Sequence, residues 1–238
     1  MNAKINFANI LFLDIETVPE SENYTDLSPE KQKLYALKTQ YQRKDEFTSE
    51  AFYHKAGIWA EFGKIICISV GFFSSFEKER VFRVKSFYGD DEQQLLIGFK
   101  ELLDKHYSGL NHVLCAHNGK EFDFPYIARR MIINRVDLPE KLNLFGKKPW
   151  EIPHLDTLEL WKFGDYKHYT SLKLMTHILG IPSPKDDIDG SQVAEVYYKE
   201  KNLERIVKYC EKDTIAVVQL LLRLYNLEIL KESEIIKV

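Results

Sequence analysis

Stretches of apolar and polar residues divide the chain into strands in its first half and helices in its second half. Continuous or β-branched apolar runs predict strands at 10–13, 64–73, 80–88 and 113–116. Apolar residues at helical spacing predict helices at 29–41, 91–106, 125–132, 155–161, 172–179, 193–198 and 204–224. The polar segment from about 19 to 57 interrupts this pattern, so we expect an insertion within one domain that spans residues 1–238.

The first predicted strand ends in two acidic residues, Asp14 and Glu16, which are separated by Ile15. Because successive side chains on a strand point to opposite faces, both carboxylates share one face and Ile15 packs on the other. Two like charges held where solvent is scarce repel each other and lose hydration, and proteins usually compensate with a cation or a shared proton. The pair therefore predicts a site for a divalent metal ion.

Two further acidic residues stand in unusual surroundings. Asp213 falls within the apolar stripe of the last helix, and Tyr209 lies one turn earlier on the same face. An ionised carboxylate in such a stripe costs several kcal/mol unless it meets a hydrogen bond, an opposite charge or a metal. Asp123 precedes Pro125, which belongs in the first turn of a helix, so Asp123 lies at a helix N-terminus. Capping of that helix and metal binding are compatible roles for Asp123.

If these four carboxylates converge, they form a pocket of oxygen ligands. Such a pocket suits Mg²⁺ or Mn²⁺, which bind through few carboxylates and keep water or phosphate oxygens as their other ligands. Zinc would be expected with histidine or cysteine, and the 7 histidines include no pair at i, i+4 spacing. Two ions about 3.5–4 Å apart stabilise both the attacking and the leaving oxygen in phosphoryl displacement. The carboxylates therefore predict phosphodiester hydrolysis.

Composition narrows the function classes further. The chain has 238 residues of which 45% are hydrophobic, enough for one substantial core. Its formal net charge of −3 excludes a general attraction to polyanions, so nucleic-acid binding must be local. The 3 cysteines lack paired spacing and fit a reducing compartment. No window approaches the roughly 20 apolar residues that span a bilayer, so we expect a cytoplasmic protein without a membrane partner.

Three segments carry the acidic residues in order along the chain. The first is Leu13-Asp14-Ile15-Glu16-Thr17, the second covers residues 117–127 around Asp123, and the third runs from Tyr209 to Asp213. These segments resemble the motifs of the DEDD superfamily of 3′-to-5′ exonucleases, in its tyrosine subgroup. The greatest similarity is to the proofreading exonuclease domain of family B DNA polymerases and to stand-alone bacterial relatives, from about residue 8 to 225. The resemblance implies an α/β ribonuclease H-like fold with a five-stranded mixed sheet flanked by helices.

The resemblance also implies a role for each acidic residue. Asp14 would contact two divalent cations, Mg²⁺ or Mn²⁺, while Glu16 and Asp213 would complete the site that binds the attacking water. Asp123 would hold the second ion, largely through water. Tyr209 would orient or help deprotonate the attacking water. Because a phenol with a pKa of about 10 is a poor base at neutral pH, we expect the orienting role.

The substrate expected from the resemblance is the 3′ end of single-stranded DNA, from which nucleoside 5′-monophosphates are released. Thr17, Asn118 and Phe122 would lie against the 3′-terminal nucleotide. RNA remains an alternative substrate, since nothing in the sequence tests for a 2′-hydroxyl. A non-catalytic nucleic-acid-binding module that kept the fold is the alternative from another class. The sequence predicts no particular protein partner.

Other polar and aromatic residues permit more than one interpretation. Asp156 is more typical of a helix cap than of a fifth metal ligand. Trp59 and Phe62 fit base stacking and core packing equally well. A local group of basic residues would guide a phosphate backbone, although each one singly is more typical of solvated surface: Arg129, Arg130, Arg135, Lys141, Lys147 and Lys148.

Overall fold

A mixed β-sheet forms the centre of the computed structural model, which describes residues 5–44, 46–77, 79–165, 169–182 and 188–238. Within these residues the sheet has six strands in the order β5-β4-β1-β2-β3-β6. The strands are β1 (Ile10–Pro19), β2 (Gly63–Ser75), β3 (Val81–Tyr88), β4 (Val113–Ala116), β5 (Leu155–Asp156) and β6 (Ile235–Lys237). Strand β1 is antiparallel to β2 and parallel to β4. The central strands therefore mix both directions.

The predicted number of five strands is wrong by one. Strand β6 was not predicted, and the segment at 155–161 was assigned to a helix although its first two residues pair with β4 as β5. These strands contain three and two residues. Such segments are too short to produce a periodic pattern in the sequence.

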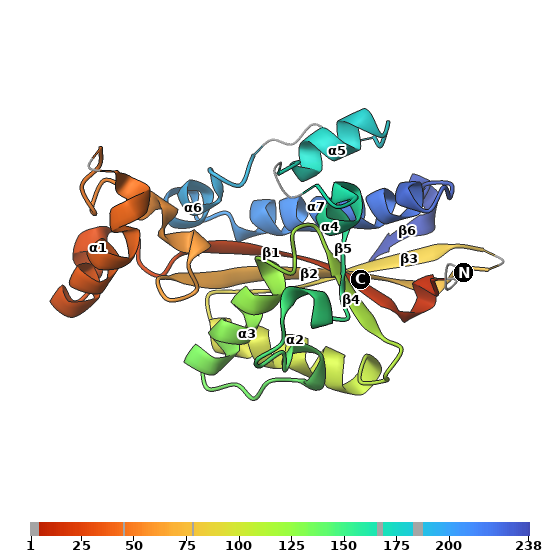
Figure 1. Ribbon diagram of the computed structural model, residues 1–238, viewed down its shortest axis with the longest axis horizontal. Helices are drawn as coiled ribbons and strands as arrows, with labels where there is room; N and C mark the ends of the chain where they lie inside the picture. The colour runs from red at the N-terminus through yellow and green to blue at the C-terminus, as the bar shows by residue number, and fades with distance from the viewer. Residues whose placement is uncertain (1–4, 45, 78, 166–168, 183–187) are drawn as a thin grey trace.

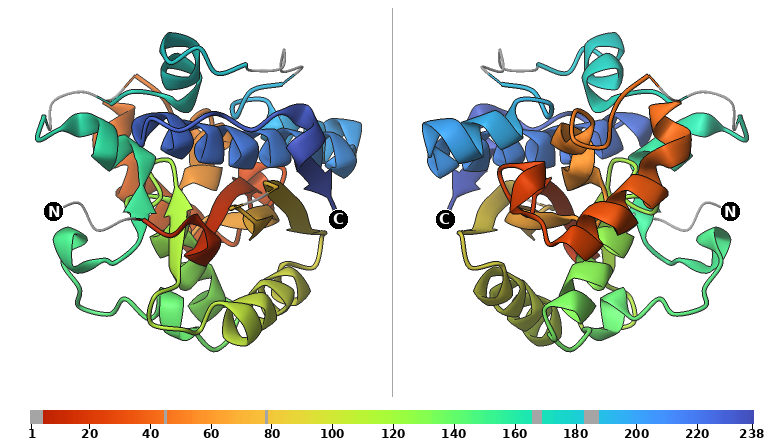
Figure 2. Two further views of the ribbon diagram at one scale, coloured as in Figure 1. Left: turned by 90° about the vertical axis from the view of Figure 1, so that its right-hand side faces the viewer. Right: turned by 90° about the vertical axis from the view of Figure 1, so that its left-hand side faces the viewer.

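Helices cover both faces of the sheet. They are α1 (Pro29–Arg43), α2 (Glu92–His106), α3 (Asp123–Ile133), α4 (Thr157–Lys162), α5 (Leu172–Ile178), α6 (Val193–Glu195) and α7 (Leu203–Leu224), with a π-helical turn at Val196–Glu200. Shorter 3₁₀ turns occur at Phe7–Asn9, Tyr24–Asp26, Tyr53–Ile58, Glu140–Leu142, Pro149–Glu151 and Glu232–Glu234. Figure 1 shows α7 along one face, and α2 and α3 on the other. The end-on views in Figure 2 show the same three layers. The predicted α/β architecture is confirmed.

The side chains of β1 alternate between two apolar cores. Leu13 and Ile15 pack into the core beneath α2 and α3, whereas Ile10 and Phe12 pack into the core beneath α7. The alternation continues beyond the apolar run, so it turns Asp14 and Glu16 toward α7. This is the arrangement that strand periodicity predicts.

The polar segment before β2 forms a small apolar cluster of its own. Helix α1 begins after Ser28, whose side chain accepts the N–H of Lys31 at 3.3 Å. The ring of Tyr35 is fully buried and lies 5.1 Å from the ring of Phe62, centroid to centroid. Trp59 packs against the same cluster. Phe62 and Trp59 therefore contribute to packing, which decides between the two roles that the sequence left open.

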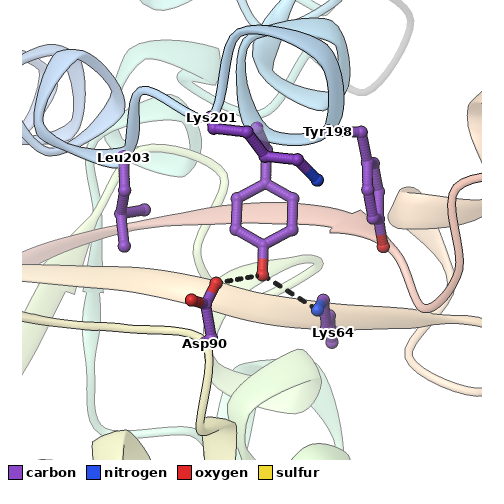
Figure 3. A pocket seen from close by; sticks show the side chains of 6 residues that line it. Lys64, Asp90, Tyr198, Lys201 and Leu203 are labelled. Atoms are coloured by element: carbon purple, nitrogen blue, oxygen red, sulfur yellow. Dashed lines mark hydrogen bonds between the residues drawn. The ribbon is translucent and has the colours of Figure 1, made fainter.

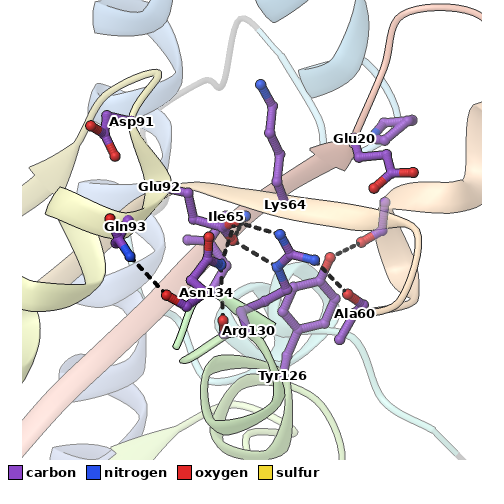
Figure 4. A network of polar contacts seen from close by, with 12 residues as sticks. Glu20, Ala60, Lys64, Ile65, Asp91, Glu92, Gln93, Tyr126, Arg130 and Asn134 are labelled. Carbon is purple, nitrogen blue, oxygen red and sulfur yellow. Dashed lines mark hydrogen bonds and ion pairs between the residues drawn. The ribbon is translucent and has the colours of Figure 1, made fainter. Parts of the chain in front are cut away.

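Arg130 lies inside the protein and not on its surface, so the predicted basic group has one member fewer. Its side chain is 6% exposed, and its guanidinium donates to Glu92 at 2.9 Å and to the carbonyl of Ala60 at 2.8 Å (Figure 4). Glu92 also accepts the N–H of Ile65 at 2.7 Å and the side-chain amide of Asn134 at 2.9 Å. This network joins α2 and α3 to β2, next to the end of β1.

No helix in the described part of the chain combines the length and the apolar character needed to cross a membrane.

Candidate active site

Asp14 and Glu16 meet the side chain of Cys210 between β1 and α7. One ligand atom from each of these residues lies within 4.8 Å of the other two. The thiol of Cys210 donates to the carbonyl oxygen of Asp14 at 3.3 Å and to its Oδ2 at 3.4 Å. Glu16 is 7% exposed, and its carboxylate has no hydrogen bond or ion pair with any residue that the structure describes. Strand β1 continues to Pro19, beyond the predicted end at residue 13, so its middle holds two carboxylates without a compensating charge among the described residues.

A bulge in β2 shapes the floor beneath these carboxylates. In the β1–β2 ladder Glu16 faces Cys67 but Thr17 faces Ile65, so Ile66 has no partner on β1. Ile66 packs with apolar residues of α6 and α7, and Cys67 packs against Cys210. Both side chains thus face α7, which a regular strand would not permit. The carboxylates rest on an apolar, sulfur-rich floor that offers them no cation.

The electrostatics of the four predicted acidic residues are linked. Burial is the largest cause that raises the pKa of Asp14 well above its ordinary value, and the charges of Asp213, Glu16 and Asp123 raise it further. Burial likewise raises the pKa of Glu16, followed by the charge of Asp213. The structure therefore brings the four carboxylates into one electrostatic group. Such a group is stabilised by protons or by a cation.

Asp123 is the first residue of α3 and is 3% exposed. Burial is the main cause that raises its pKa to about 7, and the charge of Asp156 adds to it. The backbone N–H groups of Asp123 itself and of Ile15 lower this pKa. Asp123 therefore lies near the stretch of β1 between the other two carboxylates.

Tyr209 lies half-buried on α7, beside Asp213. Its hydroxyl forms a hydrogen bond with Asp213. Burial, and then the negative charges of Asp213, Glu16 and Asp14, raise the pKa of this hydroxyl well above its ordinary value. Tyr209 therefore keeps its proton at neutral pH and acts as a hydrogen-bond donor.

Asp156 organises the turn that leads into α3. Its side chain accepts the N–H of Leu158 at 2.9 Å as the N-cap of α4, so the predicted cap is confirmed. The same carboxylate accepts the N–H of Asn118 at 2.9 Å and that of Lys120 at 3.0 Å. Asn118 has a φ of 61°, in the left-handed region that most residues avoid. No sequence pattern indicated this second role, because no local pattern relates residues so far apart.

The three predicted substrate-binding residues lie around the start of α3. Tyr126 links two of them, since its hydroxyl lies near the side chain of Thr17 and its ring lies 5.3 Å from the ring of Phe122. Asn118 is half-buried, and its side-chain amide has no hydrogen bond within the described residues. The amide is thus free to bind a ligand.

Tyr169 is an exposed aromatic residue at the same end of the sheet that no sequence pattern indicated. Its side chain is 66% exposed, and its ring lies 6.5 Å from the ring of His117. Although the residue is largely exposed, partial burial and then the charges of Asp123 and Asp156 raise the pKa of its hydroxyl. His117 is hydrogen-bonded to the carbonyl of Thr170 at 3.0 Å and so holds this segment near β4. Tyr169 stands in a non-periodic loop, where spacing carries no signal.

A cavity of about 310 Å³ lies near the far end of β1 (Figure 3). Its lining residues are Lys64, Asp90, Tyr197, Tyr198, Lys201 and Leu203. The hydroxyl of Tyr197 donates to Asp90 at 2.6 Å and accepts from Lys64 at 3.0 Å. The hydroxyl of Tyr198 donates to the carbonyl of Pro19, the last residue of β1, at 2.5 Å. Neither lysine forms an ion pair within 4.0 Å among the described residues, but the charge of Asp90 acts on Lys64, so the cavity offers two lysines beside one carboxylate.

The mixed sheet, with acidic residues in the middle of β1 and beneath the last long helix, defines a ribonuclease H-like fold. Residues 58–234 match a family described as "predicted 3′-5′ exonuclease related to the exonuclease domain of PolB", and the chain belongs to this family. The matched range contains Asp123, Tyr209 and Asp213, while Asp14 and Glu16 precede it.

A similar fold occurs in the family B DNA polymerase from the hyperthermophilic archaeon Pyrobaculum calidifontis. The two chains superpose with a TM-score of 0.54 and 16% sequence identity over 90% of this chain. The chain spans 24% of the length of that polymerase chain. This similarity supports the ribonuclease H-like architecture.

Proposed function

We propose that the protein is a metal-dependent 3′-5′ exonuclease that hydrolyses the terminal phosphodiester bond of single-stranded DNA and releases nucleoside 5′-monophosphates. The observation that carries this proposal is the buried carboxylate of Glu16, which has no partner among the described residues and lies beside Asp14 within an electrostatic group of four acids. Membership in a family of predicted exonucleases supports the same reaction.

The acidic residues fit Mg²⁺ or Mn²⁺. They offer carboxylate oxygens, the ligands that these ions prefer, and their raised pKa values indicate negative charge that lacks a counterion. Asp14, Glu16 and Asp213 would hold one ion, and Asp123 would hold a second together with Asp14. Bound there, divalent cations would lower the pKa of the attacking water and stabilise the charge that develops on the phosphodiester oxygens.

The other residues of the site would position the reactants. Tyr209 stays protonated and donates a hydrogen bond, so it would orient the attacking water and not remove its proton. Asp213 shares a hydrogen bond with Tyr209 and would fix the direction of that hydroxyl. The apolar floor formed by Ile66 and Cys67 excludes bulk water, which strengthens electrostatic interactions above it.

The substrate strand would be bound on both sides of the carboxylates. Thr17, Asn118 and Phe122 would contact the terminal nucleotide, and the exposed ring of Tyr169 would stack on a base. Lys64 and Lys201 would bind a phosphate of the strand in the cavity near the end of β1. The sequence suggested that a basic cluster guides the phosphate backbone. Arg130 of that cluster is buried and would not contact the strand, whereas Lys64 and Lys201 would.

The proposal is tested by incubating 5′-labelled single-stranded DNA with the protein and Mg²⁺ or Mn²⁺. We expect a ladder that shortens from the 3′ end, is abolished by EDTA and is absent with Asp14→Asn. The variant Asp137→Asn removes an exposed carboxylate and serves as the matched control. An intact substrate with either metal would contradict the proposal. Strand binding without degradation would support a non-catalytic module instead.

A parallel arm with RNA of the same sequence decides the class of substrate. Faster degradation of RNA would assign the same chemistry to an exoribonuclease. We place the activity in the cytoplasm, an assignment supported by three buried cysteines that remain unpaired.

A further inference from the structure

Cys210 introduces a sulfur atom into a site that the sequence predicted to contain only oxygen ligands. Its Sγ lies 3.4 Å from Oδ2 of Asp14, and one ligand atom each from Asp14, Glu16 and Cys210 fall within 4.8 Å of one another. Cys210 is fully buried and its thiol points at the middle of β1, toward the carboxylate and the carbonyl of Asp14. The sulfur therefore lies at the boundary between the site and the core cluster that it forms with Cys67 and Val207.

Glu16 provides independent support for a ligand at this place. More than nine-tenths of its surface is buried, and no described residue donates a hydrogen bond to its carboxylate. Burial of most of this side chain removes part of the hydration of its carboxylate, which is costly when no residue replaces it. The oxygen of Glu16 faces Asp14 and Cys210, so a cation shared by these three residues would remove that cost.

The distance between two of the ligand atoms is compatible with binding to one ion. With Zn–S of about 2.3 Å and Zn–O of about 2.0–2.2 Å, two ligand atoms at a tetrahedral angle lie about 3.5 Å apart. The distance of 3.4 Å between Sγ of Cys210 and Oδ2 of Asp14 agrees with this value. Three protein ligands leave the fourth coordination position open to water, as in catalytic zinc sites.

We propose that Asp14, Glu16 and Cys210 form a binding site for a thiophilic divalent cation such as Zn²⁺ or Co²⁺. Mg²⁺ is a hard ion that takes oxygen ligands, so it gains nothing from the sulfur. Zinc and cobalt gain a third protein ligand from the thiolate, and the displaced thiol proton passes to solvent. These ions therefore bind more tightly than Mg²⁺ at the same carboxylates and compete with it.

The consequence for activity is inhibition of the Mg²⁺-dependent reaction by zinc. This consequence rests on the proposed exonuclease function, because Asp14 and Glu16 would serve both ions. The binding itself does not rest on that function and is measured without any substrate.

Titration of the metal-free protein with Co²⁺ tests the binding site. A thiolate ligand produces an intense near-ultraviolet charge-transfer band, which carboxylates do not, so we expect this band at one equivalent and its disappearance on addition of Zn²⁺. The variants Cys210→Ser and Cys210→Ala should lack the band and bind Co²⁺ at least about tenfold more weakly, the effect that removal of even an outer-shell partner causes. Cys115→Ser is the matched control, because Cys115 is equally buried but packs in another cluster.

Several outcomes would overturn the proposal. A wild-type protein without the band excludes the sulfur ligand, whatever the variants do. If the band persists in Cys210→Ser, and circular dichroism shows that this variant is folded, Cys210 is excluded as the ligand. If the band disappears only in Cys67→Ser, the sulfur ligand is Cys67. If cobalt binds as expected but no DNA is degraded with Mg²⁺, the metal site stands and the exonuclease proposal fails.

Discussion

The carboxylate of Asp156 accepts the backbone N–H of Asn118 at 2.9 Å, across 38 positions of the chain. Asn118 adopts a left-handed conformation there, and its carbonyl accepts the N–H of Phe122 at 3.0 Å, just before Asp123 begins α3. The position of Asp123 therefore depends on a residue of another element. Asp156 is a positioning residue for the candidate site.

Replacement of Asp156 tests this dependence. Asp156→Ala removes acceptors for Asn118, Lys120 and Leu158, so we expect the free energy of unfolding to fall by about 1–3 kcal/mol. Turnover should fall further than folding alone explains, because Asp123 is no longer held in a fixed position. Urea denaturation measures the change in the free energy of unfolding. Exonuclease assays, under conditions in which the variant is fully folded, measure the change in turnover. Ser171→Ala, which removes the cap of α5 only, is the control. Equal turnover in the two variants would contradict the positioning role.

The metal-free protein should become less stable as pH rises. The pKa of Asp123 is raised from its ordinary value of 3.8 to about 7, so between these values the folded protein holds a proton that the unfolded chain has released. The free energy of unfolding therefore decreases from about pH 4 to about pH 7. Asp14 and Glu16 act in the same direction.

Thermal unfolding at several pH values in EDTA measures this slope. Asp123→Asn should flatten it, because an amide does not titrate in this range, and saturating Mg²⁺ should raise the midpoint most at the upper end. A midpoint that rises with pH in EDTA would contradict the buried, uncompensated carboxylates.

Tyr209→Phe separates an orienting role from that of a general base. Because the pKa of Tyr209 is raised well above its ordinary value, the hydroxyl does not titrate near neutral pH. We expect kcat to fall about tenfold, as for removal of one hydrogen bond, with an unchanged shape of the pH–rate profile. Steady-state assays across pH measure both. A decrease above a thousandfold together with a missing pH limb would identify Tyr209 as a base.

The cavity lysines are expected to affect binding more than chemistry. Lys64→Gln with Lys201→Gln should raise KM for single-stranded DNA and leave kcat nearly unchanged, because the cavity lies beyond the end of β1. The slope of log affinity against log salt should decrease by about 0.7 for each phosphate that a lysine no longer neutralises. Lys33→Gln, an exposed change on α1, is the control. An unchanged salt slope in the double variant would exclude the cavity from the path of the strand.

The buried ion pair of Arg130 and Glu92 affects the stability of the fold. Glu92→Gln leaves the guanidinium of Arg130 buried with its charge uncompensated, so we expect the free energy of unfolding to fall by roughly 3–5 kcal/mol. The double variant Glu92→Leu with Arg130→Met should recover most of this decrease. Chemical denaturation of both variants measures the difference. A double variant no more stable than the single one would show that the network contributes beyond the pair.

Sequence patterns determined the local features of this protein. The cap at Ser28 with Pro29 defines the start of α1, and apolar spacing predicted the extent of α7 to within one residue at its start. Alternation along β1 placed Asp14 and Glu16 on one face, because the direction of successive side chains on a strand is a property of the backbone.

The tertiary structure alone decided which distant groups meet. Cys210 donates to Asp14 across 196 positions, Arg130 is drawn into the core by Glu92 across 38 positions, and the bulge in β2 places Ile66 on the same face as Cys67, toward α7. Such interactions depend on strand register and helix packing, which are set by the whole core and leave no periodic signal in the sequence. The acids could be predicted one by one, whereas their sulfur neighbour and their supporting residues could not.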